Sequence, residues 1–172
     1  MIVCVGPTSS GKTTLLKRLQ QLETGESRTT PMPSTVPTVG VDVASIRARR
    51  QTFHIREVGG AMAPLWAQQC SGAMAVMYVI DSANLQQFSA AVIQLLDLLN
   101  LDGLRRVPFL LVFNKIDVYS GVSLNEYKSA FRLNDIIYHA ERDVKVVDLS
   151  SLTGYGLDEI LEWLKGLETV SK

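Results

Sequence analysis

The sequence lacks most of the features that mark specialised classes of protein. Its 172 residues contain only two cysteines and two histidines, so neither a disulfide framework nor a Cys/His metal site is expected. We predict that Cys4 and Cys70 are reduced and inert, as is usual for cysteines in the cytosol. No apolar run is long enough to span a bilayer, and no charged-then-apolar leader is present. These absences indicate a cytoplasmic protein whose function must be sought in local motifs.

Charge of one sign is not in excess either. Seventeen basic residues balance seventeen acidic ones, so the composition predicts no nucleic-acid partner and no direct attraction to a membrane surface. Met1-Ile2 lacks the glycine that myristoylation requires, and Ser171-Lys172 offers no cysteine for prenylation. No direct lipid anchor is therefore expected. Because 47% hydrophobic residues is ordinary for a globular protein, residues 1–172 are predicted to form a single domain, which we expect to be monomeric.

The most informative motif is Gly6–Thr13, with the sequence GPTSSGKT. It fits the phosphate-loop pattern G-x-x-x-x-G-K-[ST] and follows the apolar run Ile2–Val5. Leucines at helical spacing come after it: Leu15, Leu16, Leu19 and Leu22. In this strand–loop–helix context the backbone N–H groups point at phosphate oxygens, and the start of the helix adds its positive dipole end. We predict that Lys12 reaches the β- and γ-phosphates and that the Thr13 hydroxyl binds Mg²⁺. The predicted nucleotide-binding residues of the loop are Thr8, Ser9, Ser10, Gly11, Lys12, Thr13 and Thr14.

Strand-like and helical patterns alternate along the rest of the chain. Buried or half-buried strands are predicted near residues 2–5, 41–48, 52–58, 73–81, 107–114 and 144–149. Helices are predicted behind the phosphate loop, along Phe88, Val92, Leu95, Leu96 and Leu99, more weakly near 123–131, and along Leu157, Ile160, Leu161, Leu164 and Leu167. Residues 27–38 are polar, with three prolines, and are predicted to form a mobile loop. The pattern indicates an α/β fold with a mostly parallel six-stranded sheet and helices on both faces.

A second motif, Asn114-Lys115-Ile116-Asp117, follows the fifth strand-like run, at the edge where ligands bind in open α/β sheets. The Asp117 carboxylate can accept hydrogen bonds from the N1–H and the exocyclic amine of guanine, whereas adenine has no such pair of donors. Asn114 can tie this segment to the phosphate loop, and the stem of Lys115 can lie along the base. Alone, the motif is also compatible with an ordinary polar turn. Its combination with a phosphate loop favours a guanine nucleotide.

The segment Ser150-Ser151-Leu152 follows the last predicted strand. A backbone N–H of this segment stands where it can meet the 6-oxo group of guanine. A serine pair at this place is equally typical of a turn that caps a helix. We include Ser150, Ser151 and Leu152 among the predicted nucleotide-binding residues.

With these motifs in order, the chain resembles the Ras-like small GTPases, a branch of the P-loop NTPases, and is most similar to the Arf-like family. The segments that carry the resemblance are Pro37-Thr38-Val39-Gly40, Glu57-Val58-Gly59-Gly60, Pro64-Leu65-Trp66 and Thr153-Gly154-Tyr155-Gly156-Leu157. The segments Glu57–Met62 and Arg132–Ile137 resemble a divergent member of that family. The likeness extends over the whole chain.

The resemblance implies a GTP/GDP switch with bound Mg²⁺. The Thr38 hydroxyl is then a metal ligand, Glu57 holds the metal through water, and Thr38 and the Gly60 N–H position the attacking water and the γ-phosphate. It also implies protein effectors, an exchange factor and a GTPase-activating protein, which bind surfaces at Thr38–Arg56 and Gly60–Gln69. A role in intracellular or ciliary trafficking follows from the same resemblance, with recruitment to membranes through partners.

Three departures from the family pattern affect these expectations. Glu57 stands in place of the usual aspartate, and the longer side chain puts ordinary Mg²⁺ binding in question. Ala61 stands in place of the glutamine that orients water, so hydrolysis is expected to be very slow and no catalytic residue is assigned. The amphipathic N-terminal helix of Arf proteins has no counterpart here, so their membrane switch is not inferred.

The surface around the switches also differs. The aromatic trio of Arf proteins corresponds to Val41, Arg56 and Gln69. The predicted hairpin is basic instead, with Arg47, Arg49, Arg50 and Arg56. This is consistent with an ordinary solvated edge or with a docking site for an acidic effector.

Two alternatives to a cycling switch remain. A non-cycling adaptor would use its nucleotide only to support the fold and a binding surface, and Ala61 and Glu57 favour it. A small-molecule kinase would share the phosphate loop, but the segment Asn114–Asp117 argues against it. Single-turnover hydrolysis and a comparison of ATP with GTP separate the three.

Overall fold

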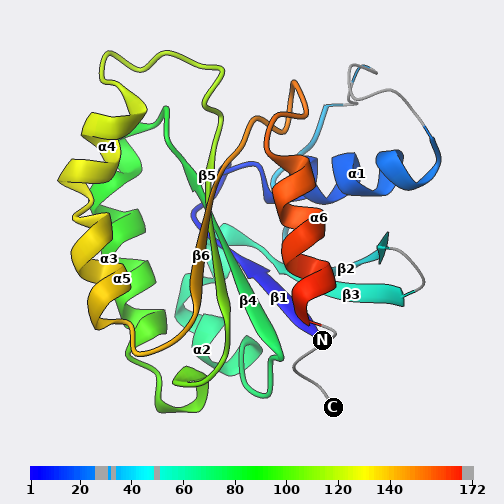
Figure 1. Ribbon diagram of the computed structural model, residues 1–172, viewed down its shortest axis with the longest axis horizontal. Coiled ribbons are helices and arrows are strands. Elements are labelled where there is room, and N and C mark those ends of the chain that lie inside the picture. The colour runs from blue at the N-terminus through cyan, green and yellow to red at the C-terminus, as the bar shows by residue number, and fades with distance from the viewer. Residues whose placement is uncertain (26–30, 32–33, 49–50, 168–172) are drawn as a thin grey trace.

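The computed structural model describes residues 1–25, 31, 34–48 and 51–167. They build one six-stranded sheet in the order β2-β3-β1-β4-β5-β6 (Figure 1). The strands are β1 (Ile2–Val5), β2 (Val41–Ala48), β3 (Gln51–Val58), β4 (Ala75–Asp81), β5 (Phe109–Asn114) and β6 (Val144–Asp148). All neighbouring pairs are parallel except β2 and β3, which form an antiparallel hairpin. The predicted mostly parallel sheet is confirmed.

In the described part of the chain, six α-helices and three short 3-10 turns accompany the strands. The α-helices are α1 (Lys12–Glu23), α2 (Trp66–Gln69), α3 (Phe88–Leu99), α4 (Leu124–Ala130), α5 (Leu133–His139) and α6 (Leu157–Gly166). The 3-10 turns are η1 (Gly60–Leu65), η2 (Leu85–Gln87) and η3 (Asp102–Leu104). None of the helices in the described ranges is long and apolar enough to cross a membrane.

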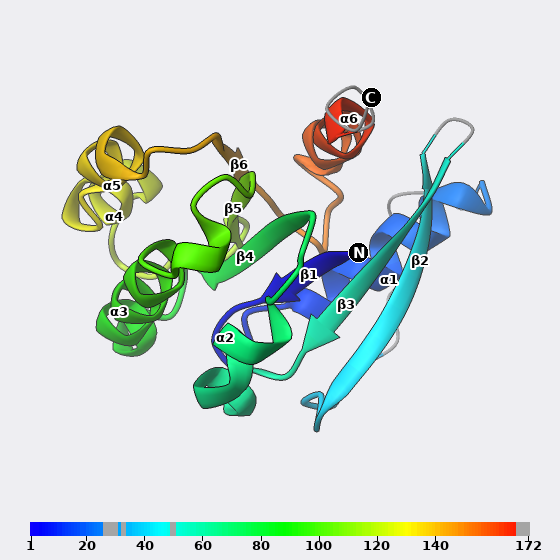
Figure 2. The same cartoon turned by 90° about the horizontal axis from the view of Figure 1, so that it is seen from below.

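The helices lie on both faces of the sheet, and Figure 2 shows the same layers from below. α1 and α6 pack on one face, where Leu15, Leu19 and Ile160 join buried strand residues. α2, α3, α4 and α5 cover the other face, around residues such as Leu95 and Phe131. The central strands β1, β4 and β5 are buried along their whole length, which explains their nearly continuous apolar sequence.

The sequence placed most elements correctly, with three differences. β4 and β5 begin two residues later than predicted, at Ala75 and Phe109. On α3 the buried side chains are Ala91, Leu95, Leu98 and Leu99, whereas Leu96 is 39% exposed. The weak helix near 123–131 is followed by a second one, α5, which the sequence analysis missed. Arg132 separates the two because it adopts a left-handed conformation with φ 53°.

Two predicted features fall wholly or partly outside the described residues. The turn at Arg49-Arg50 is one of them. Most of the predicted mobile loop 27–38 is the other, and its described residues 34–38 form neither helix nor strand.

Candidate nucleotide-binding site

The phosphate loop joins β1 to α1 at the carboxyl edge of the sheet. Gly6 lies so close to β4 that a Cβ there would be 2.1 Å from the carbonyl oxygen of Val79, and its φ of 147° is also unfavourable for other residues. Gly11 precedes the first residue of α1, so Lys12 and Thr13 occupy the first turn of the helix. The loop therefore presents the helix N-terminus toward the site, as an anion-binding segment requires.

Lys12 is buried in this loop. Its Nζ donates hydrogen bonds to the carbonyl oxygens of Gly6 at 2.8 Å and Pro7 at 2.9 Å. Burial lowers the pKa of Lys12 below its ordinary value, while the negative charge of Glu57 acts in the opposite direction. A phosphate group brought close to this ammonium would compensate its desolvation. Lys12 is thus fixed where a phosphate ligand stabilises it.

A cavity of about 350 Å³ opens above the loop. The predicted residues that line it are Thr8, Ser9, Gly11, Lys12, Thr13, Thr14, Thr38, Glu57, Gly60 and Lys115. Thr35, Val36 and Met62 line it as well, although no motif indicated them as site residues. The predicted residues Ser10, Asn114, Asp117, Ser150, Ser151 and Leu152 do not line it. The cavity corresponds to the phosphate and metal part of the predicted site.

Three predicted metal-binding side chains meet in this cavity. The Thr13 hydroxyl donates to Oε1 of Glu57 at 2.5 Å, and the Thr38 hydroxyl donates to the same oxygen at 3.0 Å. The two hydroxyl oxygens lie 3.0 Å from each other. Mg²⁺ prefers oxygen ligands, so this set of donors fits the metal. Within the described ranges no three His, Cys, Asp or Glu side chains are placed so that they could hold a metal ion together, so the fit rests on two hydroxyls and one carboxylate.

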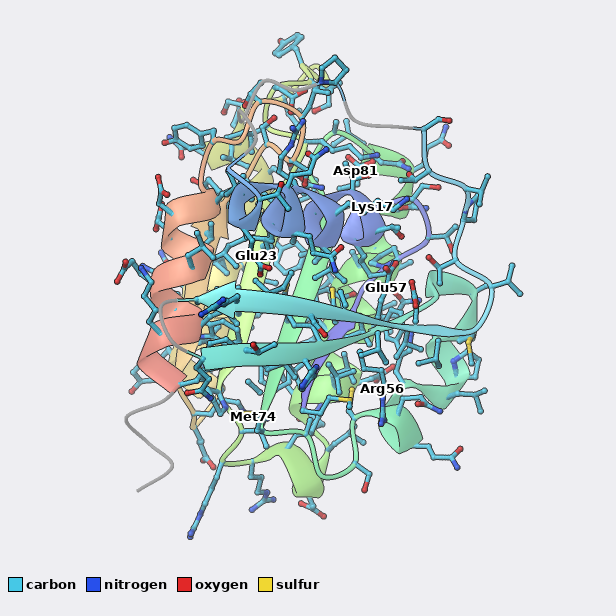
Figure 3. The ribbon with its side chains drawn as sticks, turned by 90° about the vertical axis from the view of Figure 1, so that its right-hand side faces the viewer. Lys17, Glu23, Arg56, Glu57, Met74 and Asp81 are labelled. Atoms are coloured by element: carbon cyan, nitrogen blue, oxygen red, sulfur yellow. The ribbon has the colours of Figure 1, made fainter. Side chains whose placement is uncertain are left out.

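Glu57 reaches this cluster from the end of β3. The strand pairs with β1 beside Cys4 and with β2 beside Asp42, and Glu57 is only 3% exposed. Figure 3 shows Glu57 and its neighbour Arg56 pointing away from β3 in different directions. Arg56 donates to the carbonyl oxygen of Gln69 instead. The strand register therefore aims the carboxylate of Glu57 at the two hydroxyls.

Gly60 packs directly on the phosphate loop. A Cβ at this position would lie 2.2 Å from the backbone nitrogen of Thr8, so the close approach requires glycine. The next residue, Ala61, is exposed and lines the cavity with a methyl group only. Gln68 on α2 is exposed and Gln69 is half-buried, and neither lines the cavity. Among the described residues, no glutamine lines the cavity.

Asn114 connects the two halves of the site. Its Nδ2 donates to the carbonyl oxygen of Ser10 at 2.8 Å, and its Oδ1 accepts from the N–H and the hydroxyl of Ser151 at 3.1 and 3.0 Å. The neighbouring Lys115 donates from Nζ to the carbonyl oxygen of Ser9 and to Oδ2 of Asp81, both at 2.7 Å. The tie to the phosphate loop that was predicted for Asn114 is present, and Lys115, predicted to lie along the base, adds a second one.

The remaining guanine-motif residues have different surroundings. Asp117 is exposed in the loop after β5, with its carboxylate accessible. Ser150 shapes a tight turn, because its hydroxyl accepts from the N–H of Thr153 and its carbonyl accepts from the N–H of Gly154. The serine pair does not cap α6, because the N-cap of that helix is Gly156. The contact of this segment with a guanine base stays a prediction.

Comparison with known proteins agrees with this geometry. The profile of the ADP-ribosylation factor family matches residues 1–167. The chain belongs to this family. It is 38% identical over 167 residues to human ADP-ribosylation factor-like protein 16, covering 96% of this chain and 84% of that protein. It is also 30% identical over 165 residues to ADP-ribosylation factor-like protein 3 of Chlamydomonas reinhardtii, covering 95% and 87% of the two chains.

A solved structure shares the fold of this ADP-ribosylation factor family member. The small GTPase Arl6 (BBS3) from Trypanosoma brucei, determined with the nucleotide analogue GppNp, superposes with a TM-score of 0.81 at 23% identity. The alignment covers 99% of this chain and 98% of that one. The Ras-like fold is therefore shown, and the resemblance to a divergent Arf-like protein is confirmed.

Sequence reasoning missed three residues that hold the site of this family member together. Gln87 donates from Nε2 to the carbonyl oxygen of Thr8, and Asp81 pairs with Lys115. Arg18 bonds the loop that contains Ser151. For Arg18 the signal was present, because a basic residue stands three positions after Leu15 on the apolar stripe of α1. For Gln87 and Asp81 no local pattern indicates a contact with residues so distant in sequence.

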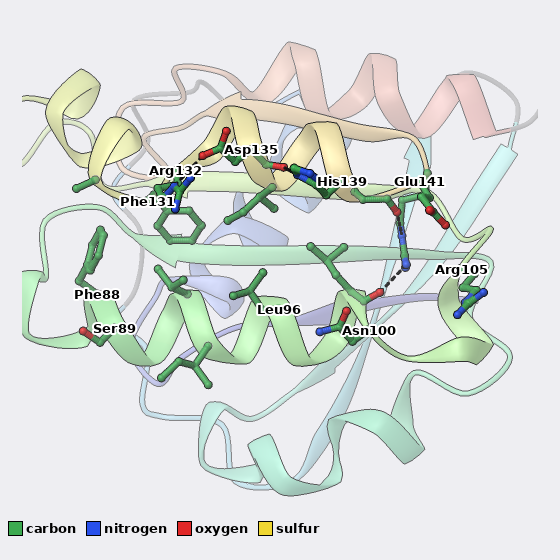
Figure 4. Close-up of a pocket in the computed structure, with 17 residues that line it drawn as sticks. Phe88, Ser89, Leu96, Asn100, Arg105, Phe131, Arg132, Asp135, His139 and Glu141 are labelled. Carbon is green, nitrogen blue, oxygen red and sulfur yellow. Dashed lines mark hydrogen bonds and ion pairs between the residues drawn. The ribbon is translucent and has the colours of Figure 1, made fainter.

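A second cavity of about 740 Å³ lies between α3 and α5, away from every predicted site residue (Figure 4). Its apolar lining includes Val92, Leu96 and Ile136, and Arg132, Asp135 and Glu141 are among its charged residues. Arg132 and Asp135 form an ion pair with each other at 2.7 Å.

Proposed function

We propose that this member of the ADP-ribosylation factor family is a guanine-nucleotide switch that binds GTP and GDP with Mg²⁺. The observation that carries the proposal is the side chain of Asn114, which joins Ser10 of the phosphate loop to Ser151 of the loop after β6. A nucleotide that contacts the phosphate loop at one end and the segment Asn114–Asp117 at the other would bridge parts that this side chain already holds in register.

Different residues of the site would bind the phosphates, the metal and the base. Lys12 and the backbone of the phosphate loop bind the β- and γ-phosphates. Thr13, Thr38 and Glu57 would hold Mg²⁺, which neutralises phosphate charge when bound. The Asp117 carboxylate selects guanine through its N1–H and exocyclic amine. Gly60, held on the phosphate loop by close packing, offers its N–H to the γ-phosphate.

Switching follows from the position of Thr38 and Gly60. Thr38 bonds Thr13 and Glu57, and Gly60 packs on Thr8 of the phosphate loop. A γ-phosphate and its metal would add further contacts to both residues. Loss of the γ-phosphate would release both segments, which is an order–disorder switch. Release of Thr38 would therefore change the neighbouring surface made by β2 and β3 with the nucleotide state.

Hydrolysis is proposed to be slow without a partner. Unassisted turnover by a Ras-type enzyme with its glutamine is already on the order of 10⁻⁴ s⁻¹. Ala61 cannot orient a water molecule, so a partner protein would have to supply the missing group. The second candidate, a non-cycling adaptor with a structural nucleotide, is favoured by Ala61 and by the contacts that Glu57 makes to both threonines.

The test is single-turnover hydrolysis of bound GTP, with and without a cell extract, beside the variant Ala61→Gln. A switch predicts acceleration by extract and partners that bind only one nucleotide form. A rate that neither extract nor Ala61→Gln changes, with the same partners retained by the GDP and GppNp forms, supports the adaptor. Tighter binding of ATP than of GTP would overturn both and favour a kinase.

We propose that effectors and regulators bind the surfaces Thr38–Arg56 and Gly60–Gln69. These surfaces include Val41, which is 44% exposed, and the half-buried Arg56. The resemblance supports a role in intracellular or ciliary trafficking, in the cytoplasm or at membranes reached through partners. Imaging of the tagged chain together with a variant that lacks nucleotide binding, Lys12→Ala, tests this placement.

A further inference from the structure

Arg18 is a basic residue in the interior of the protein. It lies on α1 and is only 1% exposed. Its Nε donates to the carbonyl oxygen of Ser151 at 3.1 Å, and its Nη2 donates to the carbonyl oxygen of Leu152 at 2.9 Å. Its Nη1 donates to Oε1 of Gln21 at 3.1 Å, one turn further along the helix. One guanidinium thus holds two successive carbonyls of the loop after β6.

The contact is not explained by stability alone. Removing a guanidinium from water is costly, and replacing buried charged groups with apolar side chains of similar size is often neutral or stabilising. Arg18 also stands on the stripe of α1 that carries Leu15, Leu19 and Leu22, where a leucine or methionine would suit the pattern. The guanidinium of Arg18 is planar and carries several N–H donors in fixed positions, so it is well suited to set the orientation of two peptide groups.

Fixing the two carbonyls also fixes the N–H groups of the loop. In a trans peptide the C=O of one residue and the N–H of the next point in opposite directions. Arg18 holds the C=O of Ser151, so the N–H of Leu152 points away from Arg18. Within the described ranges the N–H of Leu152 has no hydrogen-bond acceptor. The N–H of Ser151 faces Asn114 on the side of the guanine motif.

We propose that Arg18 is a positioning residue for guanine recognition, which holds the Ser151–Leu152 loop so that the N–H of Leu152 meets the 6-oxo group of the base. The inference rests on the proposed function, since it requires a guanine nucleotide. Arg18 itself does not contact the base. It acts through the backbone, on the carbonyl oxygens of Ser151 and Leu152, while Asn114 accepts from the N–H and the hydroxyl of Ser151.

The experiment compares three diphosphates that differ only in the base. Guanosine has the 6-oxo and 2-amino groups, inosine lacks the 2-amino group, and 2-aminopurine riboside lacks the 6-oxo group. Affinities are measured by calorimetry for the wild type, Arg18→Met, Arg18→Lys, and the exposed neighbour Lys17→Met as matched control. Thermal unfolding establishes that each variant is folded.

We expect Arg18→Met to lower the affinities for the guanosine and inosine diphosphates by about tenfold each, because loss of a well-aligned hydrogen bond typically costs that much. The 2-aminopurine diphosphate should bind as it does to the wild type. Arg18→Lys, which can reach one carbonyl only, should show a smaller loss, and it carries the test if Arg18→Met does not fold. Lys17→Met should leave all three affinities unchanged.

The affinities for the three diphosphates distinguish a positioning role of Arg18 from a purely structural one. An equal loss for all three diphosphates indicates a purely structural role for Arg18 and overturns the inference. Unchanged affinities in both Arg18 variants overturn it as well. A wild type that binds the guanosine and 2-aminopurine diphosphates equally refutes the proposed function itself. Asp117→Ala provides the complement, since it should reduce the ratio of guanosine to inosine affinity, which Arg18→Met leaves unchanged.

Discussion

The amide oxygen of Asn114 accepts two hydrogen bonds from Ser151, one from its N–H at 3.1 Å and one from its hydroxyl at 3.0 Å. The amide nitrogen of the same side chain donates to Ser10 at 2.8 Å. Asn114 is 1% exposed, so all three bonds lie in the interior. A single side chain at the end of β5 therefore connects the phosphate loop to the loop after β6.

Asn114→Ala should weaken GDP binding by about a hundredfold, because three buried hydrogen bonds of roughly 1 kcal/mol each are lost. The free energy of unfolding should fall by about 2–3 kcal/mol in the absence of nucleotide. Calorimetry and urea unfolding measure the two effects. Ser151→Ala removes only one hydroxyl and should cost roughly 1 kcal/mol. Equal effects of the two variants would show that Asn114 does not bridge the loops.

The phosphate loop and the guanine motif could be recognised in the sequence because each is a short contiguous pattern. The order of β1, the glycine loop and α1 fixes what Lys12 and Thr13 do, whatever the rest of the chain contains. The sheet was predictable for a similar reason, since buried parallel strands such as β4 appear as continuous apolar runs. Local rules were sufficient for these parts.

The family resemblance predicted that Thr13, Thr38 and Glu57 share the metal site, but it did not predict their direct hydrogen bonds. These bonds depend on the pairing of β3 with β1, and a sequence pattern does not give the reach of a side chain. The helix α5 was missed because Arg132 interrupts the apolar spacing with a left-handed residue. Arg18 differs from these, because its place on a leucine stripe was a visible signal.

Glu57→Gln keeps the shape of the side chain and an oxygen that can accept from both threonines, but it removes the negative charge. If Glu57 helps to hold Mg²⁺, the free Mg²⁺ concentration that half-maximally slows GDP release should rise about tenfold or more, because a carboxylate is the only charged protein group in this set. Release of a fluorescent GDP derivative over a series of Mg²⁺ concentrations measures this. An unchanged midpoint would exclude Glu57 from the metal site. Glu57→Asp tests whether the shorter carboxylate of the family serves equally well.

Cys70 should respond to pH because it is buried. Burial raises the pKa of its thiol to about 11, above the ordinary value of about 8.5. The unfolded chain therefore loses this proton first, and the free energy of unfolding should fall as pH rises from about 8.5 to about 11. At pH 8 the native thiol should resist iodoacetamide. Cys70→Ala should show a weaker decline of stability over the same pH range, and rapid labelling of native Cys70 would contradict the prediction.

Arg142, just before β6, bonds the end of α3 and lines the cavity between α3 and α5. Its guanidinium donates to the carbonyl oxygens of Leu99 at 2.5 Å, Leu104 at 2.6 Å and Ala140 at 2.9 Å, and it lies 5.3 Å from the ring centroid of Phe109. Arg142→Met should remove this donor from all three carbonyls, of which that of Leu104 keeps the N–H of Val107, and the free energy of unfolding should fall by about 2–3 kcal/mol. Nucleotide affinity should stay constant, because no residue of the nucleotide site contacts Arg142 among the bonds described.

Arg132→Met is the matched control, since Arg132 is exposed and pairs with Asp135 across one helical turn at the surface. Exposed pairs of this kind contribute little, so its effect on the free energy of unfolding should be below about 1 kcal/mol. Urea unfolding with constant m-values measures both variants. If Arg142→Met were no more destabilising than Arg132→Met, the three carbonyl bonds would contribute nothing beyond what water supplies. A loss of GDP affinity in Arg142→Met alone would instead show that the α3 end is coupled to the site, through β5 and the segment Asn114–Asp117 that follows it.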